Sequence, residues 1–306
     1  MTLDIPDIVR RRAVSRGPAG EAWLTALPGL VRDLAEEWDL ELGATLTGGT
    51  EGLVVAASLA DGLPAVLKLN FPGADPSLGE LRALRAGGGR GYAQLYRHDE
   101  AREAVLLERL GPQLHELGWP LDAQLQAICA TLKLAWRPLA DSDGFIDGAG
   151  KAKALAEYIE TAWRDLDHPC PERTIAAALA FAEARGRAFD PELAVLAHGD
   201  AHAWNTLQAP GDGPERFRFV DPDGLFIEPA YDLAIPMREW SQPLLAGDPL
   251  ALGQARCQRL AELTGLDPEP IWQWGLIERT STGLACLQLG LDGGEMLAVA
   301  NAWAGA

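Results

Sequence analysis

The sequence is poor in cysteine: it has four among 306 residues, and none forms a Cys-x-x-Cys pair. Because these cysteines lie far apart, neither a structural zinc site nor a dense disulfide framework is indicated. The N-terminal segment MTLDIPDIVRRRAVSR has no apolar core typical of a signal peptide, and no apolar run is long enough to span a bilayer. We therefore expect a cytoplasmic protein.

Basic residues are also scarce. The chain has 26 lysines and arginines against 44 aspartates and glutamates, which gives a net charge of −18. Such a surface repels nucleic acid and anionic membranes, so neither is expected as a partner. The acidic charge has two interpretations: it can attract a cationic small-molecule substrate, or it can simply keep the protein soluble. Nothing in the sequence indicates the oligomeric state.

The N-terminal third of the chain is rich in predicted strands. They cover three short apolar runs at 53–59, 65–69 and 104–109. The dipeptide Asp61-Gly62 predicts that the first two strands form a hairpin. Before them, residues 20–40 show the apolar spacing of a helix, with a break expected near Pro28 because proline interrupts helices.

One helix, at 77–86, is also predicted among these strands, and the remainder of the chain is mostly helical in pattern. Helices are predicted there at 121–136, 151–164, 172–186, 248–264 and 270–289, and two short strands at 194–197 and 217–220. Since strands gather in one part of the chain and helices in the other, we predict an α+β protein of two lobes. The boundary falls near Gly111-Pro112, which gives lobes of residues 1–111 and 112–306.

The strongest chemical signal is the segment HGDAHAWN at 198–205, which follows the apolar run AVLA. Its spacing, His-x-Asp followed by four residues and Asn, is that of the kinase catalytic loop. There the aspartate accepts the proton of the attacking hydroxyl, and the asparagine reaches a metal on the phosphates. Alone, an Asp–Asn pair more often caps a turn. We expect Asp200 to be the catalytic base and Asn205 a metal ligand.

A second acidic residue strengthens this interpretation. Asp221 lies sixteen residues beyond Asn205, in the sequence FVDPDG, and also follows a short apolar strand. This is the place of the aspartate that holds magnesium in kinases, with proline in place of phenylalanine. Alone, the segment would be a turn. The order and spacing of the two segments together predict that Asp221 is the second magnesium ligand.

Upstream residues complete a nucleotide site. Lys68, in AVLK, resembles the strand lysine that pairs with nucleotide phosphates, although it could instead be an edge-strand lysine. Glu80 is the helix glutamate expected to orient it, with Glu51 and Glu103 also nearby in sequence. The backbone N–H groups of Gly48 and Gly49 would cover the phosphates, although the full G-x-G-x-x-G pattern is missing.

These segments together resemble the aminoglycoside phosphotransferase family. The resemblance rests on 198–205, on Val220-Asp221-Pro222 and on EPAYDLA at 228–234. ELRAL at 80–84, VLLERL at 105–110 and GEAWL at 20–24 are similar to the streptomycin 6-kinase and hydroxyurea kinase branch of that family.

The resemblance implies a protein-kinase-like fold, with a strand-rich N-terminal lobe, a larger helical lobe and ATP with Mg²⁺ as cofactors. The backbone of residues 107–112, including Glu108 and Leu110, would bond the adenine. The family transfers the γ-phosphoryl group of ATP to a hydroxyl group of an antibiotic. Asp232 would support the catalytic loop from the protein interior rather than act on the substrate.

Three functions stay open at this point. The first is an antibiotic-inactivating kinase of the streptomycin or hydroxyurea type, and the second is a housekeeping kinase for a metabolite alcohol. The third is a nucleotide-binding pseudokinase, which the presence of base, lysine and both metal ligands argues against. The first two differ only in the substrate pocket, where the fold does not determine function.

Overall fold

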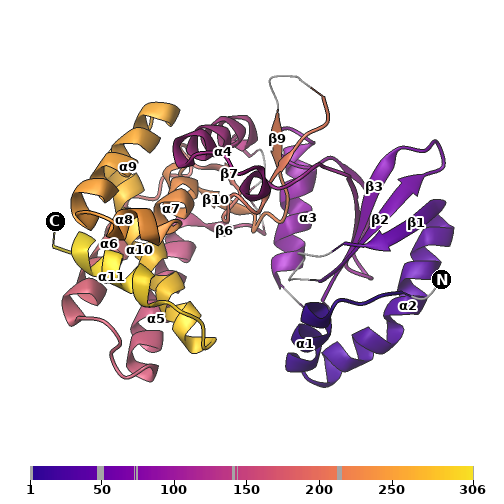
Figure 1. The fold of residues 1–306 in the computed structure, drawn as a ribbon, viewed down its shortest axis with the longest axis horizontal. Coiled ribbons are helices and arrows are strands. Elements are labelled where there is room, and N and C mark those ends of the chain that lie inside the picture. Colours follow the sequence, from indigo (N-terminus) through magenta and orange to yellow (C-terminus); the bar gives the residue numbers. More distant parts are fainter. Residues whose placement is uncertain are drawn as a thin grey trace. The chain divides into compact units, whose positions relative to one another are not determined.

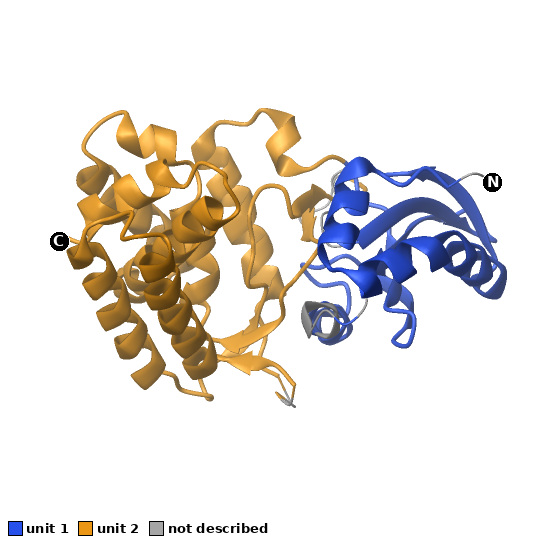
Figure 2. Ribbon diagram, turned by 90° about the horizontal axis from the view of Figure 1, so that it is seen from below, with its two compact units in different colours: residues 1–111 blue, residues 112–306 orange. Residues whose placement is uncertain are grey.

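The computed structural model describes residues 3–46, 52–71, 73, 75–139, 142, 144–211 and 216–305. The chain divides into two compact units, Met1–Gly111 and Pro112–Ala306, which Figure 2 shows in different colours.

The N-terminal unit is built on a five-stranded antiparallel sheet with the strand order β1-β2-β3-β5-β4. Its strands are β1 (Leu40–Thr45), β2 (Gly52–Leu59), β3 (Pro64–Asn70), β4 (Leu95–Asp99) and β5 (Ala104–Glu108). Strands β2 and β3 pair with Leu53 opposite Leu69, which confirms the predicted hairpin. In its turn, Asp61 Oδ1 accepts the Leu63 N–H at 3.0 Å, and Gly62 has a φ of 83°.

Helices α1 (Asp7–Ser15) and α2 (Pro18–Trp38) contribute one face of this unit's core. In Figure 1, α2 lies alongside the strands. The predicted break at Pro28 is wrong, because α2 runs through it without interruption. Leu27 and Val31, on either side of the proline, are both buried in the core, and this packing outweighs the hydrogen bond that proline cannot make.

Side-chain alternation along β3 separates the core from the polar face of the sheet. Leu67 and Leu69 are buried in the core formed with α1 and α2. Because successive side chains of a strand point to opposite faces, Lys68 points to the other side. There it meets Glu80 of helix α3 (Asp75–Gly87).

The C-terminal unit is mainly helical, as predicted. It contains the 3₁₀ turn η1 (Leu114–Leu117) and helices α4 (Leu121–Ala135), α5 (Gly148–Asp165), α6 (Glu172–Arg187), α7 (Ala230–Arg238), α8 (Ser241–Leu245), α9 (Pro249–Thr264), α10 (Pro268–Gln288) and α11 (Gly294–Trp303). Helix α10 is central, since it packs against α5, α6, α7, α9 and α11. Most of its residues from Ile271 to Leu284 are buried.

Five short strands in this unit carry the loops of chemical interest. They are β6 (Ile146–Asp147), β7 (Val195–Ala197), β8 (Thr206–Gln208), β9 (Phe217–Phe219) and β10 (Leu225–Ile227). Strands β6, β10 and β7 form one sheet in that order, and β8 pairs with β9 as an antiparallel hairpin. The segment 198–205 therefore links β7 to β8, and the segment 220–224 links β9 to β10.

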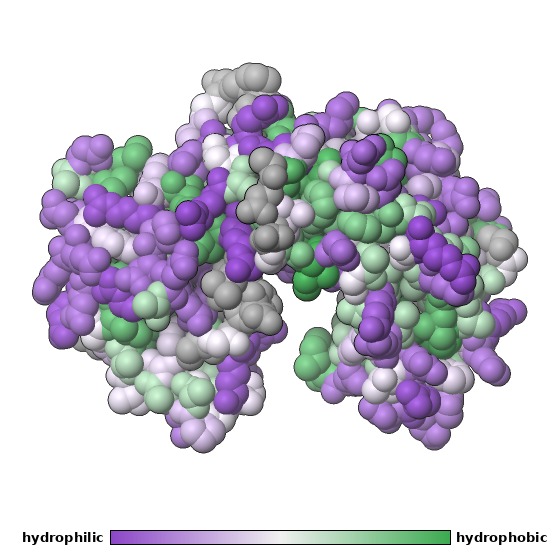
Figure 3. Space-filling model, turned by 180° about the vertical axis from the view of Figure 1, so that it is seen from behind, coloured by the Kyte–Doolittle hydropathy of each residue, from purple (hydrophilic) through white to green (hydrophobic). Residues whose placement is uncertain are grey.

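Figure 3 shows hydrophilic residues over most of the face it presents, with hydrophobic residues scattered among them. Among the described residues, no helix has both the length and the apolar content needed to cross a bilayer.

Candidate active site

A buried histidine joins the two loops of the C-terminal unit that carry the predicted acidic residues. His198 directly follows β7 and is fully buried. Its Nε2 lies 2.9 Å from the carbonyl oxygen of Val220, and its Nδ1 accepts the Asp200 N–H at 3.1 Å. This arrangement fits the neutral imidazole with the proton on Nε2. Burial is the largest influence on this ring and lowers the pKa of His198.

Asp232 of α7 holds the start of the same loop from inside the protein. Its Oδ2 accepts the N–H groups of His198 at 3.0 Å and of the Trp136 indole at 2.8 Å. Its Oδ1 accepts the Gly199 N–H at 2.8 Å. Asp232 is fully buried, so these three donors satisfy a carboxylate that has no contact with water.

Gly199 has to be glycine at the turn that follows. Its φ is +92°, a conformation that side chains disfavour. A Cβ atom at this position would also lie only 2.7 Å from the Cβ of Asp223. The two loops therefore approach each other closely just before Asp200.

The β8–β9 hairpin brings Asn205 and Asp221 close together. Thr206 pairs with Phe219, and the Val220 N–H donates to the Asn205 carbonyl oxygen at 3.0 Å. Asn205 thus lies opposite Val220, one residue from Asp221. The Asn205 Nδ2 donates to the Asp200 carbonyl oxygen at 3.1 Å, so the amide oxygen is the atom of this side chain suited to bind a cation.

Donors hold both oxygens of the Asp200 carboxylate. Arg238 Nη2 lies 2.6 Å from Oδ1. His202 Nε2 lies 3.1 Å from Oδ2, and the Asn205 Nδ2 donates to the same oxygen at 3.5 Å. The side chain of Asp200 remains 32% exposed. Since a carboxylate has about four lone-pair positions, two on each oxygen, Oδ1 can still accept a proton or a hydrogen bond from a ligand.

Electrostatics keep Asp200 ionised. Burial is the largest single influence and would raise the pKa of Asp200, but the hydrogen bond from His202 and the charge of Arg238 together outweigh it. The net result is a pKa well below the usual range for aspartate.

Further charged residues, which the sequence did not point to, surround this carboxylate. Arg238 also contacts Glu278 and Glu239 at 3.3 Å each. Asp223 is accessible to solvent, yet burial by the surrounding protein atoms raises its pKa to about 6. The charge of Lys151 lowers this pKa, whereas the charges of Asp200 and Glu278 raise it further. The site therefore holds more negative than positive charge.

Trp204 lies in the loop but not in the core. Its ring is stacked on that of His115, with centroids 3.7 Å apart. The residue is nevertheless 48% exposed. The turn η1, which contains His115, therefore supplies a packing partner for the ring.

In the N-terminal unit, Lys68 and Glu80 form a buried ion pair. Lys68 Nζ lies 2.8 and 2.9 Å from the two carboxylate oxygens of Glu80, and both side chains are nearly inaccessible. The Asn70 amide nitrogen donates to the same carboxylate at 2.9 Å. Glu80 therefore holds the ammonium group in one place. Gly48 and Gly49 lie outside the described residues.

The predicted adenine-binding segment follows β5. The Glu108 N–H donates to the Gln94 carbonyl oxygen at 2.9 Å, so this N–H is not available to a nucleotide. The Glu108 carboxylate accepts the Gln94 N–H at 3.0 Å, which ties the end of β5 to the segment before β4. Leu110 lies just beyond the strand and is half-buried.

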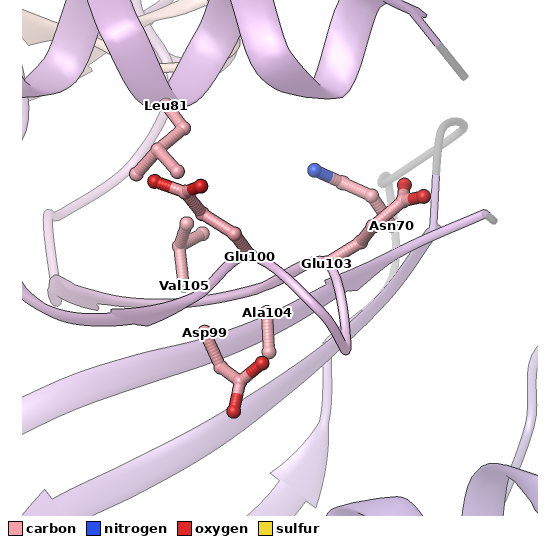
Figure 4. A pocket seen from close by; sticks show the side chains of 7 residues that line it. All are labelled: Asn70, Leu81, Asp99, Glu100, Glu103, Ala104 and Val105. Atoms are coloured by element: carbon pink, nitrogen blue, oxygen red, sulfur yellow. The ribbon is translucent and has the colours of Figure 1, made fainter. Parts of the chain in front are cut away.

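Figure 4 shows a pocket in the same unit. It is lined by Asn70 and by three carboxylates, Asp99, Glu100 and Glu103. Each of these carboxylates already accepts an N–H from this unit. The pocket contains none of the residues predicted to carry the chemistry.

The donor set in the C-terminal unit suits magnesium rather than a transition metal. Within the part of the chain that the structure describes, no group of three or more His, Cys, Asp or Glu side chains is arranged to hold a metal. Magnesium is usually held by one or two protein oxygens together with the phosphates of a nucleotide. The amide oxygen of Asn205 and the carboxylate of Asp221, brought together by the hairpin, fit that pattern.

The sequence profile of the aminoglycoside/hydroxyurea antibiotic resistance kinases matches residues 37–289. The chain belongs to this family. Its members are phosphotransferases, and membership implies the use of ATP. The family resemblance seen in the catalytic loop is thereby confirmed over most of the chain.

Named relatives agree with this family assignment. The chain is 30% identical to the streptomycin 6-kinase of Streptomyces griseus over 99% of its own length and 97% of the relative. It is 31% identical to the streptomycin 6-kinase of Streptomyces glaucescens, with 87% and 85% covered. It is 32% identical to the hydroxyurea phosphotransferase of Kitasatospora aureofaciens, with 76% and 67% covered.

Solved structures confirm the kinase-like fold. The chain matches the choline kinase LicA from Streptococcus pneumoniae with a TM-score of 0.58 at 14% identity, covering 91% of this chain and 97% of that one. It matches a type I macrolide 2'-phosphotransferase with a TM-score of 0.57 at 17% identity, covering 91% and 96%. At such low identity these matches establish the fold alone.

Proposed function

We propose that this kinase transfers the γ-phosphoryl group of ATP to a hydroxyl group of a cationic aminoglycoside of the streptomycin type. Two relatives named streptomycin 6-kinase support this choice, one of them aligned over 99% of the chain. The hydroxyurea phosphotransferase is aligned over 76%. The negative charge around Asp200 also favours a cationic acceptor.

The observation that carries the proposal is the state of the Asp200 carboxylate. It is ionised, held on both oxygens by His202 and Arg238, and still one-third exposed. A carboxylate in this state can accept a hydrogen bond from a substrate hydroxyl and thereby set its direction of attack. A residue with a merely structural role would have no need of this exposure.

In the proposed reaction, the substrate hydroxyl oxygen forms a bond to the γ-phosphorus while the bond from that phosphorus to the ADP oxygen breaks. The hydroxyl proton passes to Asp200. Because the pKa of Asp200 is low, it is a weak base, and the proton moves late, when the attacking oxygen has become acidic. Most of the catalysis then comes from positioning and charge stabilisation, as expected for phosphoryl transfer.

The residues present fit a magnesium ion bound with the nucleotide. Asn205 and Asp221 would hold the metal, and its charge would offset that of the phosphates. Lys68, fixed by Glu80, would bind the phosphates through its ammonium group. We assign nucleotide binding to the N-terminal unit, including Gly48, Gly49, Glu108 and Leu110, and the catalytic loop with the substrate pocket to the C-terminal unit. Dependence on ATP also favours a cytoplasmic location.

An acceptor screen tests the proposal. Purified protein is incubated with Mg-ATP and, in separate reactions, streptomycin, hydroxyurea, choline or ethanolamine. ADP formation is measured, and the acceptor is examined for a new phosphoryl group by mass spectrometry. We expect phosphorylation of streptomycin by the wild type and at least about 10²-fold less by Asp200→Asn, since a general base contributes about 10²–10⁴-fold.

The alternatives give different results. Phosphorylation of hydroxyurea but not streptomycin would assign the other branch of the family. Phosphorylation of choline or ethanolamine alone would indicate a metabolite kinase. Nucleotide binding without any phosphorylated acceptor would favour the pseudokinase.

A further inference from the structure

Arg238, the last residue of α7, contacts three carboxylates at once. Its Nη2 lies 2.6 Å from Asp200 Oδ1, its Nη1 lies 3.3 Å from Glu278 Oε2, and its Nε lies 3.3 Å from Glu239 Oε1. Its side chain is 12% exposed. A guanidinium group is rigid and planar, so binding at several of its edges fixes the whole group.

The partners of Arg238 are themselves held in place. Glu278 is buried in the central helix α10, and its Oε1 accepts the hydroxyl of Tyr231. Asp200, in turn, receives a second donor on Oδ2 from His202 of its own loop. One oxygen of Asp200 is therefore held from the loop and the other from helix α7.

Two buried arginines fix the end of α7, from which Arg238 extends. Arg256 of α9 donates to the carbonyl oxygens of Glu239 at 2.6 Å and Trp240 at 3.2 Å. Arg279 of α10 donates to the carbonyl oxygen of Met237 at 2.6 Å and to that of Glu239 at 3.1 Å. The last carbonyls of a helix carry partial negative charge and lack helical partners, so Arg256 and Arg279 donate to acceptors that need them.

The orientation of Asp200 depends on this arrangement. A carboxylate held by one donor can rotate about its last side-chain bond. A carboxylate held on both oxygens by donors from two separate elements has its plane determined. Because a misplacement of about 1 Å can cost about 10²-fold in rate, the second donor has a catalytic consequence.

We propose that Arg238 is a positioning residue, which orients the Asp200 carboxylate toward the acceptor hydroxyl by bridging it to Glu278. The inference rests on the proposed function, because it takes Asp200 as the proton acceptor. Arg238 acts through Asp200 and does not itself touch the reacting atoms. Lysine at this position could contact Asp200 or Glu278 but could not bridge them with a planar fork.

A double-mutant cycle tests this assignment. Arg238→Met should lower kcat by about 10- to 100-fold, with the KM for Mg-ATP changed less than about twofold. Arg238→Lys should recover part of the loss. In the Asp200→Asn background, Arg238→Met should lower kcat by less than about threefold, because residues that act as one unit are not additive. Equal losses in both backgrounds would overturn the proposal, since Arg238 would then act independently of Asp200.

Arg102→Met is the matched control for the loss of an ion-paired arginine. Arg102 contacts Asp99 and Glu37 in the N-terminal unit and is 24% exposed. We expect a lower Tm with kcat close to wild type. If Arg238→Met likewise lowers only Tm, its ion pairs are structural and the assignment is wrong.

A measurement without substrate separates this inference from the proposed function. In nitrogen-15 NMR of the wild type, the guanidinium of Arg238 should show restricted rotation, with separate Nη signals that Arg238→Lys assigns by their loss. In Asp200→Asn these signals should shift and broaden. Unchanged signals would refute the link between the two residues, whether or not streptomycin is the acceptor, whereas a failed acceptor screen would refute the proposed function alone.

Discussion

Replacing Asp232 by asparagine tests how the catalytic loop is held. The wild-type carboxylate is fully buried and accepts three N–H groups, from Trp136, His198 and Gly199, at 2.8 to 3.0 Å. Asparagine has nearly the same shape but only one acceptor oxygen. If that oxygen faces Trp136 and His198, the new NH₂ group faces the Gly199 N–H, so two donors oppose each other at a fully buried position.

The magnitude follows from this arrangement. One charge-assisted hydrogen bond is lost, worth about 1.5–3 kcal/mol, and the unsatisfied buried N–H groups cost about 1–3 kcal/mol more. We therefore expect the free energy of unfolding to fall by about 2.5–6 kcal/mol. For a unit of this size, each 1 kcal/mol lowers Tm by about 2–4 °C, so Tm should fall by about 5–24 °C.

Thermal and urea unfolding, followed by circular dichroism, measure the effect. Asp248→Asn is the matched control, because Asp248 accepts backbone N–H groups at the exposed start of α9, where asparagine is an equally good cap. We expect that variant to lie within about 0.5 kcal/mol of wild type. A loss below about 1 kcal/mol for Asp232→Asn would show that the loop does not depend on the buried carboxylate.

Three further predictions concern individual site residues. Asp200→Asn should lower kcat by about 10²–10⁴-fold with little change in the KM for Mg-ATP, whereas Asp221→Asn should lower kcat and also raise that KM. Steady-state kinetics measure both constants, and a wild-type rate for Asp200→Asn would exclude this loop as the catalytic one. Glu80→Gln leaves the buried Lys68 ammonium without the charged partner it has in Glu80, so the free energy of unfolding should fall by about 3–5 kcal/mol. The KM for Mg-ATP should rise about tenfold. An unchanged KM would argue against a phosphate contact by this lysine. Burial lowers the pKa of His198 from 6.5, so in acid the unfolded chain binds a proton that the native state excludes. The stability contributed by the neutral ring is therefore complete above pH 6.5. It is lost as the pH falls toward the native pKa. The Tm difference between wild type and His198→Gln should therefore shrink from pH 7.5 to pH 5.5, and a constant difference would contradict this.

Much of the secondary structure could be predicted from local pattern. The β2–β3 hairpin has a turn dipeptide between two apolar runs, and α9 and α10 have long helical periodicity, so each shows its type within its own residues. Helix α7 was missed because it is short and contains Pro236. Strands β8 and β10, of three residues each, were also missed, whereas β7 and β9, of the same length, were predicted.

The order and spacing of the segments around Asp200 and Asp221, taken together, predicted the kinase chemistry of this protein. Asp200 and Asn205 are five residues apart, and a short loop forces them to be neighbours whatever surrounds them; the structure joins them by a hydrogen bond. The sequence also placed Lys68 and Glu80 on adjacent elements, because a strand and the helix that follows it pack together.

Only the tertiary structure decided which charged side chains surround the Asp200 carboxylate. Arg238 lies 38 residues beyond Asp200 and Glu278 a further 40, and no local pattern relates them. They meet because α7 and α10 pack side by side beneath the loop, with Arg256 and Arg279 fixing the end of α7. Contacts of this kind depend on the folding of the whole unit, whereas a motif depends on neighbouring residues alone. The sequence could therefore predict the reaction but not the residues that hold the Asp200 carboxylate.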